Sequence, residues 1–312
     1  MKLFYSLSVK IIFSLFFFLF SFDVYSLQMP YAVFPENPRP GEPVTVGLRT
    51  ASGAKNAVLV SDGKRLTRAV FFDIHAEDEK TPLVAAVFAV PSTAKPGSAV
   101  IIVECSRGIL GEISIEIAER DFESEIIDLN PSLSSLRADY DSKKTAEANY
   151  LWSILNHNGK DAYYYGYFIP PVNSTRRTSA FGGRRVYRYS NGTSDVSIHA
   201  GIDYGVPRGT EVIACGAGKV VLARFRIVTG NSVIIEHLPG FYSLYYHLDS
   251  IDVSEGAVIH TGTRLGLSGA TGLATGPHLH WEIRVFGENC DPDAFLAGPI
   301  LDKDAILSRI CP

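Results

Sequence analysis

The chain has 312 residues, with 29 Lys and Arg against 33 Asp and Glu, so its formal net charge is −4. This balance argues against a nucleic-acid-binding protein, which normally carries a clustered basic excess. Hydrophobic residues make up 46% and charged residues 20%, which excludes a largely disordered chain. The length suggests two domains and allows a core that needs neither disulfides nor metal. Recurrent Val and Ile runs, with 27 Gly and 15 Tyr, favour a β-rich protein.

The N-terminal residues have the features of a signal peptide. Two lysines lie within the first ten residues, and residues 11–22 form an uninterrupted run of apolar residues and Ser. Small side chains at Val24 and Ser26 suit signal peptidase, so residues 1–26 are expected to be removed. A membrane span needs roughly 18–20 apolar residues, so this run is short for a permanent anchor. An uncleaved membrane anchor stays the alternative to a cleaved signal peptide. We expect an exported protein, in the periplasm or cell envelope or secreted, with a membrane contact only if this segment is retained.

The four cysteines all follow the signal segment, and disulfides persist outside the cytoplasm. They allow three complete pairings, among which the sequence does not choose; a bridge between Cys290 and Cys311 would tie down the C-terminal tail. Cys215, in the apolar run VIACGAG, is expected to be a small buried residue. No pair has C-x-x-C spacing, so a cysteine zinc site or redox motif is not expected.

Residues 27–119 alternate short apolar runs with turn residues, beginning with VTVGLRT after the Pro- and Gly-rich PENPRPGEP. Short strands at this spacing predict an antiparallel β-sandwich, resembling bacterial immunoglobulin-like domains. Nothing in this part suggests catalysis. His75 and the acidic cluster at 77–79 are interpreted as solvated turn residues.

Residues 120–164 break the alternation and predict a helical connector. Apolar residues recur at helical spacing from Leu133 and Leu136, and Pro131 suits the first turn of a helix. The connector could also pack as an arm over the following domain; if it covers a groove there, removing residues 27–160 should raise activity. Strands return in residues 165–312, with a helical pattern only in the final DKDAILSRI, so the fold class is mainly β.

Two short motifs carry the candidate chemistry. His199 and Asp203 form an H-x-x-x-D pattern, and His278 and His280 form H-x-H. Residues two apart on a strand project from the same face, so the two histidines of H-x-H should point together. One H-x-x-x-D with one histidine of H-x-H supplies two His and one Asp, a set that binds catalytic zinc with an open fourth position. The other histidine, with His247 in SLYYHL, is then free for acid–base work.

These motifs occur together, in order, with distinctive neighbours: HAGIDYGVPRGTEVIACGAGKVV, GNSVIIEH, SLYYHL, VSEGAVIHTGTRLGLSGATGLATGPHLHWEIR and DPDAF. Over about residues 178–297 the chain resembles the lysostaphin/LytM-type zinc metallopeptidases, which hydrolyse peptide bonds of peptidoglycan. The resemblance implies the antiparallel β catalytic fold of that family and one zinc ion per chain. It implies the ligands His199, Asp203 and His280. It also implies that His278 and His247 are catalytic, without deciding which is the general base.

The family implies a secreted or periplasmic zinc endopeptidase acting on the peptide stems of peptidoglycan. Zinc lowers the pKa of its water from about 15.7 toward ~7, and imidazoles can move the proton. The bond cut, D-Ala to a diamino acid or a glycine bridge, stays open, as do the oligomeric state and whether the first domain targets or shields the enzyme. The alternative is a catalytically silent wall-binding or amidase-activating module, which would normally lack zinc ligands.

Three further residues are weaker site candidates. Tyr204 follows Asp203 directly, and Asn231 is interpreted as a turn residue that could line the groove. Glu282 alternates onto the face of His280, where it either supports the ligand or is simply a strand residue. His237 and His260 are expected to be structural or exposed.

Overall fold

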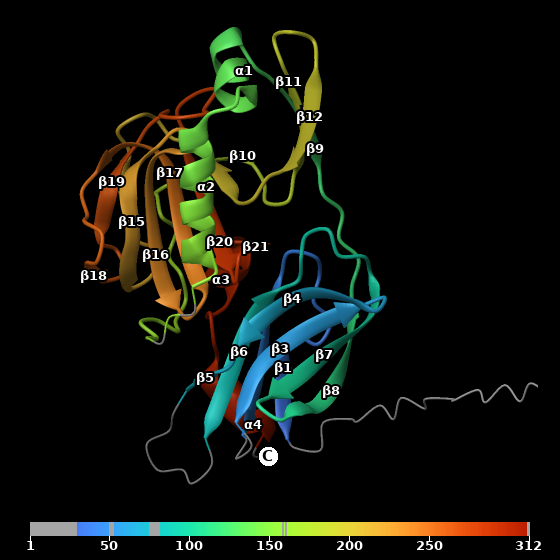
Figure 1. The fold of residues 1–312 in the computed structure, drawn as a ribbon. Coiled ribbons are helices and arrows are strands. Elements are labelled where there is room, and N and C mark those ends of the chain that lie inside the picture. The colour runs from blue at the N-terminus through green and yellow to red at the C-terminus, as the bar shows by residue number, and fades with distance from the viewer. Residues whose placement is uncertain (1–29, 50–52, 75–81, 158, 160, 311–312) are drawn as a thin grey trace, which may run out of the picture.

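The computed structural model describes residues 30–49, 53–74, 82–157, 159 and 161–310. Figure 1 shows two β bodies joined by a helical and extended segment, so the mainly β, antiparallel fold class is confirmed. The expected signal peptide, His75 with its acidic neighbours, and Cys311 lie outside the described residues. Within those ranges no helix is both long and apolar enough to cross a membrane.

The N-terminal body is a sandwich of two four-stranded antiparallel sheets, ordered β1-β2-β6-β5 and β4-β3-β7-β8. Alternation builds its core: in β7 the side chains of Ala99, Ile101 and Val103 are buried, because every second residue faces the opposite sheet. The likeness to immunoglobulin domains stays a prediction. The strands are β1 Tyr31–Phe34, β2 Pro43–Arg49, β3 Ala54–Ser61, β4 Lys64–Val70, β5 Phe72–Asp73, β6 Leu83–Ala89, β7 Gly97–Cys105 and β8 Gly108–Ile117.

Strand β6 joins the sandwich to the second body, because all seven of its residues are buried. Phe88 faces the sandwich core, while Val87 faces the larger core that continues into the second body. Helix α4, Lys303–Ile310, packs on the outer side of β1 and β2. A Cβ atom on Gly47 would lie 2.4 Å from Ile306, so the helix needs glycine beneath it. Part of the expected 165–312 unit therefore packs on the first domain.

The connector contains one strand, β9 Ser124–Asp128, and two helices, α1 Pro131–Ala138 and α2 Ser142–Leu155. Asn130 caps α1 by accepting from the backbone N–H of Leu133, and Pro131 occupies the first turn as the sequence predicts. Helix α2 packs on the second body through Leu155, which contacts an apolar cluster of sheet residues: Leu222, Ile234, Tyr242, Leu244 and Tyr246.

Strand β9 forms a three-stranded sheet with β11 and β12, in the order β12-β11-β9. Strands β9 and β11 run parallel, although the sequence analysis predicts no strand in this part of the connector. Figure 1 shows that this sheet and α1 project together beyond the second body. The bounds are β11 Arg184–Arg188 and β12 Ser194–Ile198.

The second body is built on a ten-stranded sheet whose main path is β10-β13-β20-β17-β16-β15-β18. Fully buried aromatic side chains, including Trp281 and Tyr245, fill its core. The elements are β10 Arg177–Ser179, β13 Ile202–Tyr204, β14 Glu211–Ile213, β15 Gly218–Arg226, β16 Gly230–Leu238, β17 Phe241–Ile251, β18 Val258–Ile259, β19 Arg264–Ser268, β20 Leu279–Val285, β21 Glu288–Cys290 and the short helix α3 Asp293–Ala297.

Candidate metal centre and active site

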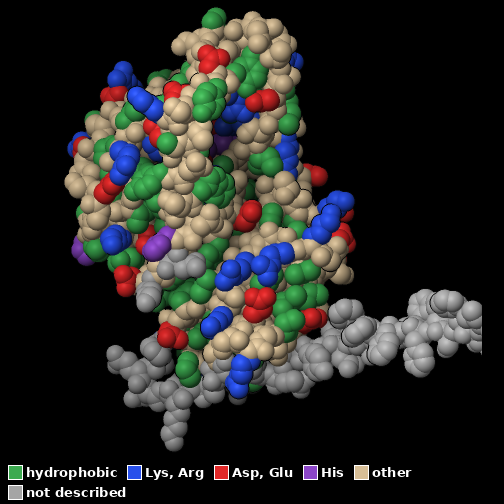
Figure 2. Space-filling view, in the orientation of Figure 1, with side chains coloured by type: hydrophobic (Ala, Val, Ile, Leu, Met, Phe, Trp, Pro, Cys, Tyr) green, Lys and Arg blue, Asp and Glu red, His purple; other side chains and the backbone are tan. Residues whose placement is uncertain are grey.

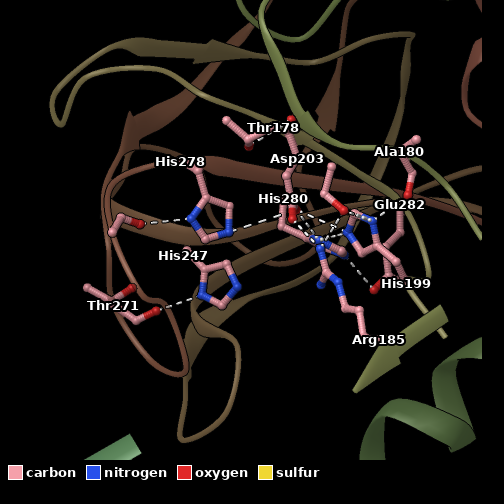
Figure 3. Close-up of polar contacts among 12 residues, drawn as sticks. Thr178, Ala180, Arg185, His199, Asp203, His247, Thr271, His278, His280 and Glu282 are labelled. Atoms are coloured by element: carbon pink, nitrogen blue, oxygen red, sulfur yellow. Dashed lines mark hydrogen bonds and ion pairs between the residues drawn. The ribbon is translucent and has the colours of Figure 1, made fainter. Parts of the chain in front are cut away.

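Three elements bring His199, Asp203 and His280 together (Figure 3). His199 follows the end of β12, Asp203 is the middle residue of β13, and His280 lies on β20. Strands β13 and β20 are antiparallel with Asp203 directly opposite His280, so both side chains project from the same face. All three residues are buried, and one potential ligand atom of each lies within 4.8 Å of the others.

Hydrogen bonding fixes which atoms face the centre of this cluster. The Nδ1 atom of His199 lies 2.7 Å from the carbonyl oxygen of Ala180, which only accepts, so Nδ1 donates. The Nε2 atom of His280 likewise donates to a carboxylate oxygen of Glu282, 2.9 Å away. In the neutral rings, the inward nitrogens, Nε2 of His199 and Nδ1 of His280, therefore carry lone pairs.

These inward nitrogens and Oδ1 of Asp203 are mutually close. Oδ1 lies 2.7 Å from Nδ1 of His280 and 3.1 Å from Nε2 of His199, and the two nitrogens are 3.1 Å apart. Converging in a buried space, these three atoms repel one another unless a cation lies between them or a ring nitrogen carries a proton that it shares with Asp203. Two imidazole nitrogens and one carboxylate oxygen suit a divalent transition metal. The residues present fit the implied metal.

The pKa values of the two histidines in the cluster are shifted in opposite directions. Burial alone would raise the pKa of Asp203, but hydrogen bonds with His199 and His280 hold it well below its usual range. Burial lowers the pKa of His199, and the pull of Asp203 only partly offsets this. At His280 burial is outweighed by Asp203 and Glu282, which raise its pKa to about 9. Carboxylates on both sides of the His280 imidazole account for its raised pKa.

His247 and His278 lie beside the cluster, their ring centroids 4.8 Å apart (Figure 3). Nδ1 of His247 donates to the carbonyl of Thr271 at 2.7 Å, and Nδ1 of His278 donates to that of Gly276 at 2.9 Å. Burial lowers the pKa of His247 to about 3, with repulsion from the neighbouring histidines adding to it, and burial also lowers the pKa of His278. Both rings are therefore neutral near pH 7, with Nε2 free to accept a proton.

The backbone at His247 is unusual for a non-glycine residue, with φ at +62°. This left-handed conformation is sparsely populated by residues with a β-carbon. It accompanies a register shift between Leu248 and Ser250 in the pairing of β17 with β19. The backbone here directs His247 toward His278 and away from the regular alternation of the strand.

A groove of about 530 Å³ runs over these residues. It is lined by residues 273–278 and by residues of the connector and β11, including Glu125, Leu133 and Tyr187. Figure 2 shows the hollow beside the helices, with a histidine deep inside it and basic side chains next to it. The connector thus contributes directly to the site.

The weaker candidates divide between the site and its surroundings. Glu282 lines the groove. One of its carboxylate oxygens accepts a hydrogen bond from Nε2 of His280 at 2.9 Å, and the other accepts one from Nε of Arg284 at 2.7 Å. Tyr204 does not line the groove: its side chain is in the core near Trp281. Alternation is the reason, because neighbouring strand residues face opposite sides and Asp203 faces the cluster. Asn231 braces the loop backbone, donating to the carbonyl of Asp249, and is not among the groove residues.

Three residues that contact the site are not indicated by the sequence. Arg185 donates to Oδ2 of Asp203 at 2.6 Å, and Ser179 lies 3.1 Å from Nδ1 of His199. Thr271 supplies the carbonyl that orients His247. Arg185 lies in the Arg pair of FGGRRVYR, which has no spacing that marks it, and a carbonyl contact leaves no trace in residue type.

The remaining histidines and the cysteines lie elsewhere. His237 is buried and bonded to the Ala217 carbonyl and the Ser243 hydroxyl, while His260 is exposed, as expected for structural or exposed residues. Cys215 is buried, which confirms that prediction. Within the described residues, the thiols of Cys105, Cys215 and Cys290 are free. The pairing of Cys290 with Cys311 stays a prediction, since its second partner falls outside those residues.

Comparison with known proteins agrees with this geometry. The sequence pattern of "Peptidase family M23" matches residues 197–292. The chain is 42% identical over 118 residues to peptidoglycan DD-endopeptidase ShyA of Vibrio cholerae, covering 38% of this chain and 27% of that one. It is 39% identical over 127 residues to DD-carboxypeptidase/endopeptidase Mpg of Neisseria meningitidis, covering 41% and 28%. The chain thus spans less than a third of the length of these relatives.

Among solved structures, that of an M23 peptidase candidate from Pseudomonas aeruginosa superposes with a TM-score of 0.57. Sequence identity is 24%, and the match covers 83% of this chain and 94% of the other. At this identity the likeness concerns the fold, and it extends well beyond the segment matched by sequence. The sequence matches thus place the likeness to peptidase family M23 in residues 197–292.

Proposed function

We propose that the protein is a zinc-dependent endopeptidase that hydrolyses peptide cross-links of bacterial peptidoglycan. The observation that carries the proposal is the convergence of lone-pair atoms from His199, Asp203 and His280 beside two neutral imidazoles in an open groove. The names of the relatives support the substrate class, because ShyA and Mpg match the segment that contains these residues.

His199, Asp203 and His280 would hold the metal, and their nitrogen and oxygen donors favour zinc. When bound, the metal acts as a Lewis acid that polarises the scissile carbonyl and activates water. The side chains of His247 and His278 each offer Nε2 as a proton acceptor in the groove. One accepts the proton of the attacking water, and the pair delivers a proton to the leaving amine nitrogen. Which of the two is the general base stays open.

The groove supports an extended peptide as substrate, because it is an open trough lined by the connector and residues 273–278. Of the two bonds considered, the DD-endopeptidase relatives favour the one between D-Ala and a diamino acid, since glycine has no configuration. Such a substrate lies outside the cytoplasm, which agrees with the proposed signal peptide at residues 1–26 and with an envelope location.

The silent-module alternative has less support. Its expected mark is the loss of a metal ligand, and all three implied ligands are present with inward-facing donor atoms. The histidines beside them also keep the neutral form that a base requires.

The test uses the full mature chain. A fragment beginning at residue 165 would lack β9, which pairs with β11, and α2, which covers the sheet. Bound zinc is measured by mass spectrometry, and muropeptide release from several peptidoglycan types is followed with and without a chelator. We expect one zinc per chain, chelator-sensitive release by the wild type, and neither property in His280→Ala. The exposed His260→Ala variant is the matched control. A wild type that binds no zinc and releases nothing rules the proposal out.

A further inference from the structure

Arg185 bridges the candidate metal ligand Asp203 and the connector. Its Nη2 atom donates to Oδ2 of Asp203 at 2.6 Å and to the Ser179 hydroxyl at 2.9 Å, while its Nε donates to Glu125. Only 13% of its side chain is exposed. Figure 3 shows the guanidinium approaching the cluster from the side away from His278.

The two oxygens of the Asp203 carboxylate therefore have different partners. Oδ1 faces the imidazoles of His199 and His280, while Oδ2 is taken by Arg185. A carboxylate can bind a metal through one oxygen or both, and rotation exchanges the two. A fixed donor on Oδ2 removes this freedom and leaves Oδ1 as the atom that faces the metal site.

We call the contacts of Arg185 with Asp203 and Glu125 the clamp. They depend on a strand pairing outside the segment matched to family M23. Arg185 on β11 lies directly opposite Glu125 on the parallel strand β9, so both side chains project into the groove. Glu125 balances the charge of the guanidinium. Without it, the positive charge of Arg185 would be balanced by Asp203 alone, at a site that must also accept a cation.

We propose that Arg185 is a positioning residue that fixes the Asp203 carboxylate for metal binding, and that Glu125 of the connector holds the guanidinium in place. The catalytic consequence of this clamp rests on the proposed function, while its effect on metal affinity does not. The connector would in this way tune the metal centre of the domain that follows it.

The experiment measures zinc dissociation constants by competition with a chromophoric chelator on full-length mature protein. We expect Arg185→Ala to weaken zinc binding by about 10–100-fold, as is usual when a hydrogen-bond partner of a ligand is lost. Arg185→Lys should not restore affinity, because an ammonium group cannot engage Asp203 and Glu125 with a planar fork. Arg188→Ala on the same strand is the control: its side chain is 57% exposed.

Glu125→Gln tests the second half of the clamp. We expect a smaller loss of affinity than for Arg185→Ala, and a double variant no weaker than Arg185→Ala alone, because Glu125 acts through Arg185. In Co²⁺-substituted protein, the visible spectrum of Arg185→Ala should differ from the wild type, since the freed carboxylate can bind through both oxygens. A purely structural role would leave that spectrum unchanged.

Wild-type zinc affinity in Arg185→Ala or in Arg185→Lys would overturn the proposal, as would losses that simply multiply in the double variant. Thermal unfolding in EDTA checks that each variant is folded. If Arg185→Ala does not fold, Arg185→Lys decides alone, and wild-type zinc affinity in that variant overturns the proposal. A wild type that binds zinc without cutting peptidoglycan would refute the proposed function and leave these affinities to decide the role of Arg185.

Discussion

Asp203 on β13 and His280 on β20 are direct partners across an antiparallel pair, with Oδ1 and Nδ1 2.7 Å apart. The candidate metal site therefore depends on strand register. A slip of one residue would turn one of the two side chains to the opposite face of the sheet. The pairing of Ile202 with Trp281, both buried in the core, fixes this register with apolar contacts on the other face.

The two roles assigned to histidines should separate in mutants. His247→Ala is expected to keep bound zinc, because its side chain makes no bond to the three ligands, while peptidoglycan hydrolysis falls by about 10²–10⁴-fold with the loss of a proton acceptor. His199→Ala should lose the metal and the activity together. Zinc content and muropeptide release, measured on the same preparations, distinguish these outcomes. Loss of zinc from His247→Ala would contradict the assignment.

Glu282 should matter for both stability and metal binding. Its carboxylate is buried between Nε2 of His280 and the guanidinium of Arg284, so Glu282→Ala leaves a buried charge without its partner. We expect a loss of about 3–5 kcal/mol in the free energy of unfolding and weaker zinc binding. Urea unfolding in EDTA gives the first quantity and chelator competition the second. The exposed Glu211→Gln is the control, and equal stability of the two variants would argue against the buried role.

The attachment of α2 should be visible in stability. Leu155 is fully buried between this helix and the sheet, whereas Asn149 on the same helix is exposed. Leu155→Ala is expected to cost about 2–5 kcal/mol of unfolding free energy, and Asn149→Ala to stay within about 0.5 kcal/mol of the wild type. Denaturant unfolding measures both. A Leu155→Ala variant as stable as Asn149→Ala would mean that α2 does not pack on the sheet in solution.

His237 gives the protein an acid-sensitive component of stability. Burial lowers its pKa to about 4 in the folded chain, below the unperturbed value of about 6.5. Between these values the unfolded chain binds more protons, so stability falls as the pH decreases from about 6.5 to 4, by about 3 kcal/mol in total. His237→Gln should flatten this slope while His260→Gln keeps it. Unfolding free energies in EDTA at several pH values provide the test, and parallel slopes for His237→Gln and the wild type would refute it.

The convergence of the candidate ligands could be predicted in part, because it follows from local rules. The spacing of His278 and His280 predicts a shared side-chain direction, and the order of the motifs indicates the resemblance to M23 peptidases. Alternation also decides against Tyr204, which is adjacent to Asp203 in sequence and therefore opposite to it in direction. The placement of neighbours on one strand is thus within reach of sequence reasoning.

Contacts between segments that are distant in sequence could not be predicted. Arg185 and Glu125 are 60 residues apart, and their meeting depends on the parallel pairing of β9 with β11, which neither segment signals alone. The short strand β9 has charged residues at two of its five positions, Glu125 and Asp128, and no buried residue, so it does not resemble a core strand. The same limit applies to α4. Its apolar face predicts a helix, but it does not reveal that the helix packs on the sandwich.

The packing of α4 on β1 and β2 has a consequence for the order in which the molecule can be completed. The outer face of β1 and β2 stays uncovered until residues 303–310 have been synthesised. The first two strands of the described fold therefore gain this packing only after α4 has been made. The sandwich and the second body should then complete their folding together. They should also unfold as one cooperative unit, with a single calorimetric transition. For the proposed peptidoglycan hydrolase, this arrangement would delay the completion of the N-terminal sandwich until residues 303–310 have emerged.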